Sequence, residues 1–334
     1  MKVDAGLHGP LDEARTRARA LEEAGYDGLL SSEIAHDPFF PLVLAADATE
    51  RVELITGIAV AFARNPMLLA NIGDDLQRFS RGRFVLGLGS QIRPHITKRF
   101  SMPWSHPAAR MEEMIRAIRA IWACWHHGEP LAFRGEFYRH TLMTPMFDPG
   151  PNPHGEPPIH LAAVGPMMTR VAGRVADGLV AHAFTTASYL EAVTLPALRE
   201  GLADSGRERD AVEVSLPLFV VTGGDDEASR AADAQQRAQI AFYGSTPAYR
   251  GVLEHHGWGD AHVELNRLSK QGRWEDMARV IDDEMLATFA IVAEPGDVAG
   301  AVLERWGGLV DRVQLGDRPD IEEWPDIVAA IRAG

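Results

Sequence analysis

Short apolar segments alternate with helical patterns along nearly the whole chain, and this alternation restricts the fold more than any other feature. The segments are apolar along most of their length instead of at every second position, which is typical of parallel strands buried on both faces. Helical patterns with apolar residues three and four positions apart follow them. The sequence therefore predicts eight strands, at residues 2–7, 28–33, 53–61, 84–88, 159–164, 179–184, 212–221 and 310–315.

Eight successive strand–helix units predict an α/β protein of the (β/α)8 TIM-barrel class. A doubly wound sheet is the alternative, although such sheets more often have about five to seven strands. Two segments depart from the alternation: residues 129–147 predict a hairpin insertion after the fourth helix, and residues 225–286 predict a helical insertion after the seventh strand. No linker of disordered composition divides the chain, so we expect residues 1–334 to form a single domain.

Charge and composition exclude several classes of protein. The net charge of -14 argues against general nucleic-acid binding. No apolar run approaches the ~20 residues that a membrane helix needs. Cys124 is the only cysteine, so no internal disulfide is possible, and the absence of an HExxH motif or a cysteine cluster predicts no metal site. We expect a cytoplasmic enzyme that acts on a small molecule, without nucleic-acid or membrane partners.

The fourth predicted strand ends in glycines, which suits the approach of a flat ligand to the backbone. Gly87 and Gly89 close this strand, and Ser90 follows. A dinucleotide fingerprint would need a third glycine at the position of Ile92, and the lysine of a P-loop is also missing. The strand end therefore predicts a ligand site of neither the Rossmann nor the P-loop type.

A second candidate site lies between the fifth predicted strand and the helix that follows it. Gly165 and Pro166 stand at this turn. Pro166 has no N–H group, so the backbone N–H groups of Gly165, Met167 and Met168 would be the donors. Together with the helix dipole, these groups predict an anion site that needs no lysine. An ordinary strand–helix turn is the alternative.

Four features taken together are similar to those of one known family. They are the segment from Ser80 to Gly89; Thr56 to Val60 followed by Arg64-Asn65-Pro66; Ala163 to Pro166 followed by Ala172-Gly173 and by Ala176 to Gly178; and the order of the elements, both insertions included. With these features the chain resembles the bacterial luciferase-like monooxygenases. It is most similar to the branch of actinobacterial oxidoreductases that use the deazaflavin coenzyme F420, and the resemblance covers nearly the whole chain.

This resemblance implies hydride transfer between coenzyme F420 and a small organic substrate. The alternative is a monooxygenase that uses oxygen and reduced FMN from a partner reductase, and a non-catalytic binding protein of the same fold is a third hypothesis. Aromatic side chains expected at the pocket favour an apolar or aromatic substrate. These side chains are Phe39, Phe40, Phe62, Trp104 and Phe184.

The resemblance also implies where the cofactor binds. It places the cofactor phosphate at the Gly165 turn and a non-proline cis peptide, at Ala59–Val60, against the flavin ring. Glu33 would lie near the polar edge of the cofactor, although a carboxylate that is solvated or paired with arginine is the alternative. The residues predicted around the cofactor are Glu33, Ala59, Val60, Ala61, Gly89, Ser90, Val164, Gly165, Pro166 and Met167.

The chain departs from the sugar-phosphate dehydrogenases of this branch at two positions. Ile92 and Ile34 stand where those enzymes carry an acidic residue and a histidine, so their acid–base pair is not expected. His95, His36 and Glu33 are the candidate catalytic residues instead. His95 is preferred as proton donor because it follows the glycine-ended strand directly. Loop packing or a surface position is the alternative for each histidine.

The strongest helical pattern carries two tryptophans on its apolar face. An apolar face that carries Trp122 and Trp125 suggests a homodimer that packs through outer helices. Packing of both side chains on the barrel is the alternative.

Overall fold

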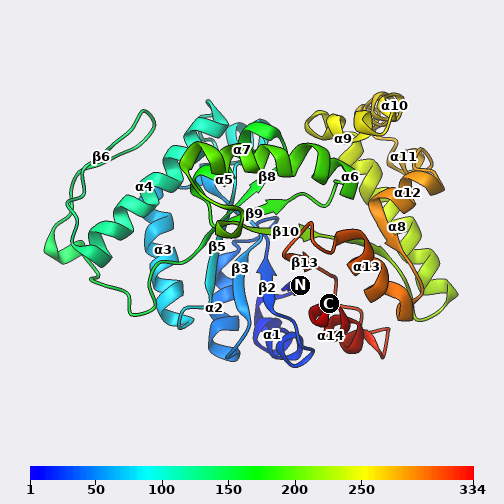
Figure 1. Ribbon diagram of the computed structural model, residues 1–334, viewed down its shortest axis with the longest axis horizontal. Helices are drawn as coiled ribbons and strands as arrows, with labels where there is room; N and C mark the ends of the chain where they lie inside the picture. Colours follow the sequence, from blue (N-terminus) through cyan, green and yellow to red (C-terminus); the bar gives the residue numbers. More distant parts are fainter. The chain divides into compact units, whose positions relative to one another are not determined.

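A computed structural model describes the whole chain, residues 1–334. Parallel strands and helices alternate along it (Figure 1), and all eight predicted strands are present. The fold is a TIM barrel, so the predicted fold class is confirmed. The eight strands are β1 (Lys2–Gly6), β2 (Gly28–Ser31), β3 (Glu53–Thr56), β5 (Phe84–Gly89), β8 (Ile159–Ala163), β9 (Gly178–Ala181), β10 (Glu213–Pro217) and β13 (Arg312–Gln314).

The chain divides into two compact units. The larger comprises residues 6–180 and 197–213, and the smaller comprises residues 1–5, 181–196 and 214–334. None of the helices is both long and apolar enough to cross a lipid bilayer.

In the larger unit, four neighbouring strands form a parallel sheet in the order β2, β3, β5 and β8. Their side chains are almost entirely buried, which explains the continuous apolar pattern. Five helices of this unit are α1 (Ala14–Glu23), α2 (Phe39–Ala48), α3 (Pro66–Phe79), α4 (Pro107–His127) and α5 (Pro166–Val175). The Asn65 side chain accepts a hydrogen bond from the Leu68 N–H at 3.0 Å and so caps α3.

Helix α4 buries both tryptophans inside the larger unit. Trp122 is fully buried and Trp125 is 2% exposed. The Trp122 Nε1–H donates to the Ala70 carbonyl of α3 at 3.0 Å. The two indole rings therefore pack on the barrel, which was the alternative interpretation, and they give no support to a dimer through this helix. The homodimer itself stays a prediction.

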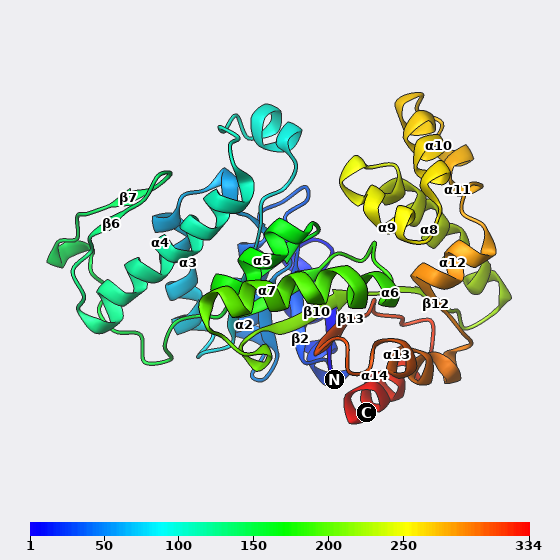
Figure 2. The ribbon, with the colours of Figure 1, turned by 45° about the horizontal axis from the view of Figure 1, so that its top comes forward.

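The predicted hairpin insertion is confirmed. Strands β6 (Phe133–Arg134) and β7 (Arg139–His140) pair antiparallel after α4 (Figure 2). Their turn is held by the Glu113 carboxylate of α4, which accepts hydrogen bonds from the N–H groups of Phe137 at 2.7 Å and Tyr138 at 2.6 Å.

In the smaller unit, β13 pairs in parallel with β1 on one side and β10 on the other. A buried ion pair joins two of these strands, with Asp4 Oδ1 and Arg312 Nη2 2.6 Å apart. The single strand predicted at residues 212–221 is two strands, because β10 ends at Pro217 and β11 (Phe219–Val221) pairs with a different partner. That partner, β12 (Ala290–Val292), was not predicted, because a three-residue strand is too short to produce a pattern.

The predicted helical insertion after the seventh strand is also confirmed. Buried apolar residues such as Ile240, Leu253, Leu265 and Leu286 give it a hydrophobic core. Its helices are α8 (Asp226–Gly244), α9 (Arg250–His255), α10 (Gly259–Lys270), α11 (Trp274–Ala278) and α12 (Asp283–Phe289). Two further helices, α13 (Val298–Trp306) and α14 (Trp324–Ala333), complete the unit.

Candidate functional site

The predicted site residues follow the carboxyl ends of four neighbouring strands of the larger unit. Glu33 and His36 follow β2, residues 57–61 follow β3, residues 89–95 end and follow β5, and residues 164–167 follow β8. Since neighbouring parallel strands end at the same edge of their sheet, the fold brings these segments together. This edge is the candidate functional site.

Glu33 is the most firmly held polar residue of this site. Its side chain is 6% exposed, and its Oε2 accepts hydrogen bonds from the Val60 N–H at 2.7 Å and from Arg64 Nη1 at 2.5 Å. Arg64 also pairs with Asp37 through its Nη2 at 2.9 Å. The charge of the carboxylate is therefore paired within the protein, and its hydrogen bonds connect the end of β2 to the segment after β3. Its predicted contact with the cofactor stays a prediction.

A non-proline cis peptide follows β3, but the predicted position at Ala59–Val60 was wrong. The cis bond is Gly57–Ile58. Ala59 and Val60 form the short strand β4 (Ala59–Val60), which pairs in parallel with the end of β5, so their peptide belongs to a regular strand. The Gly57 carbonyl accepts a hydrogen bond from Ser32 Oγ at 2.6 Å, which joins this segment to the end of β2.

The side chains of Ala59, Val60 and Ala61 are fully buried within the protein. Any contact with a ligand ring would therefore involve the backbone of this segment. Ala61 begins a short 3-10 turn that leads to the cap of α3. The contact of these three residues with a cofactor stays a prediction.

The two glycines of β5 serve the packing of the protein. A Cβ atom on Gly87 would lie 1.8 Å from the Thr56 carbonyl oxygen, and one on Gly89 would lie 2.8 Å from the Ile58 side chain. The Thr56 hydroxyl also exchanges hydrogen bonds of 2.8 Å with the backbone of Gly87. Gly87 is thus required by the close approach of β3 and not by a ligand. Ser90 is half-buried, and its Oγ donates to the Gln91 carbonyl at 3.2 Å.

The Gly165 turn is an open helix N-terminus. Gly165 is the N-cap of α5, Pro166 occupies the first helical position, and no side chain caps the helix. A Cβ atom on Gly165 would meet no atom within 4 Å. Val164 is half-buried, whereas Gly165, Pro166 and Met167 are exposed. The N–H groups of this first turn have no acceptor within the helix, so the turn can bind an anion.

The two candidate histidines lie on loops that contact each other. His36 follows β2, and His95 begins a π-helical turn at His95–Arg99 after β5. Arg99 Nη2 donates to the Ile34 carbonyl and so joins the two loops. Both histidines are exposed, and neither side chain makes a hydrogen bond or an ion pair. Both imidazole rings are therefore accessible to solvent.

Three of the aromatic residues expected at the pocket are core residues. Phe39 is 6% exposed, and Phe62 is fully buried with the Arg110 guanidinium 4.6 Å from its ring centre. Phe184 stacks on Phe289 in the core of the smaller unit, with ring centres 4.5 Å apart. The other two are not core residues: Phe40 is 62% exposed and Trp104 is half-buried. These aromatic residues are thus divided between the core and the surface, and their role in lining a substrate pocket stays a prediction.

Sequence reasoning missed the polar network of Arg64 and the environment of His182. His182 follows β9 in the smaller unit, where its ring stacks on Tyr249 with centres 4.5 Å apart. Its Nδ1 accepts a hydrogen bond from the Phe184 N–H at 3.0 Å, so the neutral ring carries its proton on Nε2. Burial lowers the pKa of His182 to about 4. The only sequence signal was its position near the end of the strand predicted at residues 179–184.

We expect His182 to remain neutral down to about pH 4, and this should appear in the stability of the protein. A histidine pKa that folding lowers from 6.5 means that the unfolded chain binds more protons, so the free energy of unfolding should fall as the pH falls from 6.5 to 4. Denaturant titrations over this pH range should show a smaller loss of unfolding free energy for His182→Asn than for the wild-type protein, because asparagine has no titrating ring. An imidazolium signal for His182 at pH 5.5 in 15N NMR would contradict the prediction.

Comparison with known proteins adds to this geometry. A family model described as luciferase-like monooxygenase matches residues 2–312. The "Uncharacterized protein Rv1360" of Mycobacterium tuberculosis is 56% identical over 313 residues, which cover 94% of this chain and 92% of that protein. A 5,10-methylenetetrahydromethanopterin reductase of Archaeoglobus fulgidus is 29% identical over 271 residues, 79% of this chain and 76% of that protein.

Solved structures show the same fold. The coenzyme F420-dependent tetrahydromethanopterin reductase of Methanopyrus kandleri superposes with a TM-score of 0.78 over 99% of this chain and 96% of its own, at 19% sequence identity. The relatives and structural neighbours together include F420-dependent oxidoreductases and monooxygenases, one of which was solved in complex with FMN. These comparisons support an oxidoreductase.

Proposed function

Because the chain belongs to the luciferase-like monooxygenase family, we propose that it transfers a hydride between coenzyme F420 and a small organic substrate. The observation that carries the proposal is the open N-terminus of α5 at the end of β8, in a chain whose named relatives include F420-dependent enzymes. When bound, the deazaflavin ring of F420 would supply the hydride chemistry.

The residues of the Gly165 turn fit the phosphate group of this cofactor. The space next to Gly165 is open, and the N–H groups of Gly165, Met167 and Met168 have no acceptor within α5. A phosphate would gain both hydrogen bonds and the favourable end of the helix dipole. Pro166 would pre-set the helical conformation of the turn without donating.

The chain's own residues would place and protonate the substrate. Glu33 is paired with Arg64 and the Val60 N–H, so we propose that it positions β4 instead of exchanging protons. His95 is the proposed proton donor, and His36 is the second candidate. Both rings are accessible to solvent and form no hydrogen bond or ion pair within the protein. The loop contact between Arg99 and Ile34 would hold the two histidines near each other.

A flavin-dependent monooxygenase is the second candidate, and the description of the matching family favours it. Reduced FMN would then come from a partner reductase, and the same turn would hold the FMN phosphate. The two cofactors both carry a phosphate, so the α5 terminus does not separate them.

Equilibrium titration of the purified protein with F420 and with FMN tests the proposal. We expect F420 to bind at least ten times more tightly than FMN, and the protein to consume no oxygen when supplied with reduced FMN. Tighter binding of FMN together with oxygen uptake would instead establish the monooxygenase. Binding of neither cofactor would contradict both.

A further inference from the structure

A cavity of about 250 Å³ lies at the opposite ends of the strands from the candidate functional site. It adjoins Asp177, which directly precedes β9 and whose Oδ2 accepts a hydrogen bond from the Ile159 N–H at the start of β8, 2.8 Å away. The lining residues are Arg116, Arg119, Arg174, Val175, Asp177 and Arg207. Four guanidinium groups thus surround one cavity in a chain whose net charge is -14.

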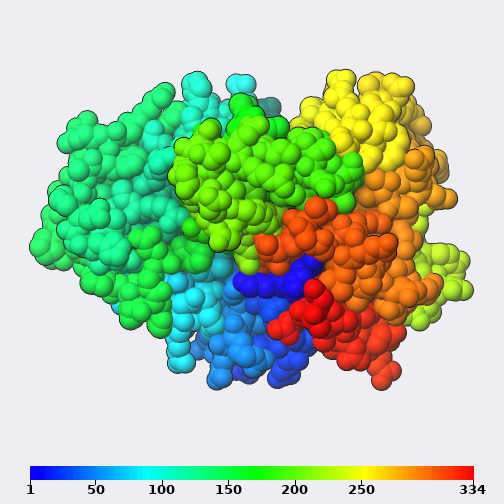
Figure 3. All heavy atoms as spheres, viewed as in Figure 1, coloured from blue at the N-terminus to red at the C-terminus, as the bar shows by residue number.

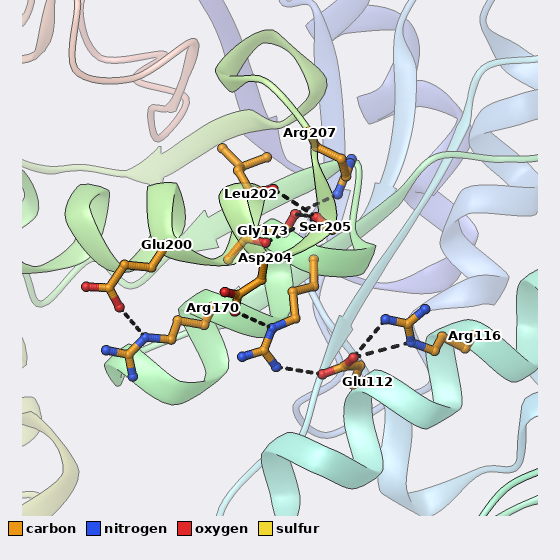
Figure 4. Close-up of polar contacts among 11 residues, drawn as sticks. Glu112, Arg116, Arg170, Gly173, Glu200, Leu202, Asp204, Ser205 and Arg207 are labelled. Carbon is orange, nitrogen blue, oxygen red and sulfur yellow. Dashed lines mark hydrogen bonds and ion pairs between the residues drawn. The ribbon is translucent and has the colours of Figure 1, made fainter.

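The close packing of two helices forms one wall of this cavity. Helix α7 (Leu195–Ser205) lies against α5 so closely that a Cβ atom on Gly201 would come within 2.1 Å of the Arg170 carbonyl oxygen. Ion pairs run along this contact. Arg170 pairs with Glu200 at 2.5 Å (Figure 4), and Arg174 pairs with Asp204 at 3.0 Å. The space-filling view shows the segment around residue 200 at the surface (Figure 3), so solvent reaches this helix.

The carboxylates around the cavity bind three of the four arginines. Glu112 of α4 accepts hydrogen bonds from Arg116 and Arg174, each at 2.9 Å. Asp177 accepts from Arg119 at 2.7 Å, and Glu156 lies 3.7 Å from Arg119. These carboxylates hold the three guanidinium groups in place. Among the residues that line the cavity, only Asp177 is acidic.

Arg207 differs from the other three, because it has no carboxylate partner. Its guanidinium donates to the backbone carbonyls of Gly173 at 2.9 Å, Ala176 at 2.8 Å and Ala211 at 3.0 Å. Burial is the main cause that lowers the pKa of Arg207, the nearby charge of Asp177 partly opposes this shift, and the charge of Arg119 adds to it. Neutral carbonyls do not cancel a positive charge, so an anion beside Arg207 would be stabilised.

Each of the four arginines also keeps a donor nitrogen that makes no hydrogen bond. These nitrogens are Arg116 Nη1, Arg119 Nε, Arg174 Nη2 and Arg207 Nε. A tetrahedral oxyanion can accept from several guanidinium groups at once, with charge-assisted hydrogen bonds that are stronger than neutral ones. The cavity is also many times larger than the ~30 Å³ that a water molecule occupies in the liquid.

We propose that this cavity binds a phosphate dianion, either as the free ion or as the phosphate group of a small monoester. The site is formed within the larger unit and lies away from the Gly165 turn, so it does not depend on the proposed cofactor. The ligand would complete the neutralisation of Arg207 and would join α4 to the end of α5.

Thermal unfolding of the full-length protein tests this site. In 10 mM inorganic phosphate the melting temperature should rise by about 2–4 °C relative to sodium chloride of equal ionic strength. Arg116→Gln removes only a half-exposed pair with Glu112, so it should fold and lose most of this rise. Arg207→Gln should lose the rise as well. Arg170→Gln is the matched control, because Arg170 pairs with Glu200 on the same helix contact without lining the cavity.

Isothermal titration with phosphate should give a dissociation constant at least ten times larger for Arg116→Gln than for the wild-type protein and Arg170→Gln. A parallel titration with glycerol 3-phosphate separates the two sources of phosphate. Tighter binding of this ester would assign the site to a phosphomonoester. Tighter binding of inorganic phosphate would assign it to the free ion. Equal effects of phosphate and chloride, or an unchanged phosphate response in Arg116→Gln, would overturn the proposal.

Discussion

Gly87→Ala is expected to lower the melting temperature by at least ~8 °C or to prevent folding, which corresponds to a loss of at least about 4 kcal/mol. The new Cβ atom would lie 1.8 Å from the Thr56 carbonyl oxygen. That oxygen belongs to the backbone of a buried strand, so it cannot move aside as the end of a flexible side chain could. Circular dichroism during heating would measure the change.

Gly165→Ala is the matched control for this substitution. Its Cβ atom would meet nothing within 4 Å, and Gly165 has a φ of −100°, which any residue adopts. We therefore expect the melting temperature of Gly165→Ala to stay within ~2 °C of the wild-type value. A Gly87→Ala protein as stable as Gly165→Ala would show that β3 and β5 do not approach as closely as described.

His95→Ala is expected to lower turnover by ~10²-fold while F420 affinity stays nearly unchanged. The reason is that His95 follows the strand that ends at the candidate site and its ring is accessible, whereas Glu33 is engaged by Arg64. A proton donor acts mainly in the transition state, so its loss should reduce kcat more than binding. Steady-state assays that follow the absorbance of F420 would measure the effect.

His36→Ala separates the two candidate donors. Its ring is also exposed and lies on the adjoining loop, so the fold should tolerate this substitution too. We expect less than a fivefold change in turnover for this variant. Near-normal turnover in His95→Ala together with a large loss in His36→Ala would transfer the role to His36.

Local patterns were enough to predict most of the fold. Strands such as β5 and β8 are buried on both faces, so their segments are apolar throughout and easy to recognise. The start of α3 depends on Asn65 and Pro66, which are adjacent in the sequence. The Gly165 turn could be predicted for the same reason, because a strand end, a glycine and a helix start follow one another directly.

Features that depend on distant contacts could not be predicted. Glu33 and Arg64 are 31 residues apart, and nothing in either segment indicates that they meet. The burial of Trp122 against Ala70 likewise depends on how α3 and α4 pack. An apolar helix face has the same pattern whether it contacts the barrel or a second copy, which is why the tryptophans suggested a dimer surface.

The position of the cis peptide shows the limit of transferring a motif residue by residue. The segment after β3 was identified correctly, but the bond lies at Gly57–Ile58, and Ala59–Val60 is a short strand. Pairing of Ala59 with Leu88 and of Val60 with Gly89 is a tertiary contact, and the segment's own sequence does not indicate it.

The central claim is that the N–H groups at Gly165 and Met167 hold the cofactor phosphate. Binding of F420 and of its deazaflavin fragment without the phosphate should be measured for the wild-type protein and for Gly165→Val, whose larger side chain would fill the open space at the turn. We predict that the wild-type protein prefers F420 by at least ~100-fold, about 2.7 kcal/mol, and that Gly165→Val loses this preference while binding the fragment normally. Equal affinity of the wild-type protein for both compounds, or an unchanged preference in Gly165→Val, would contradict the claim.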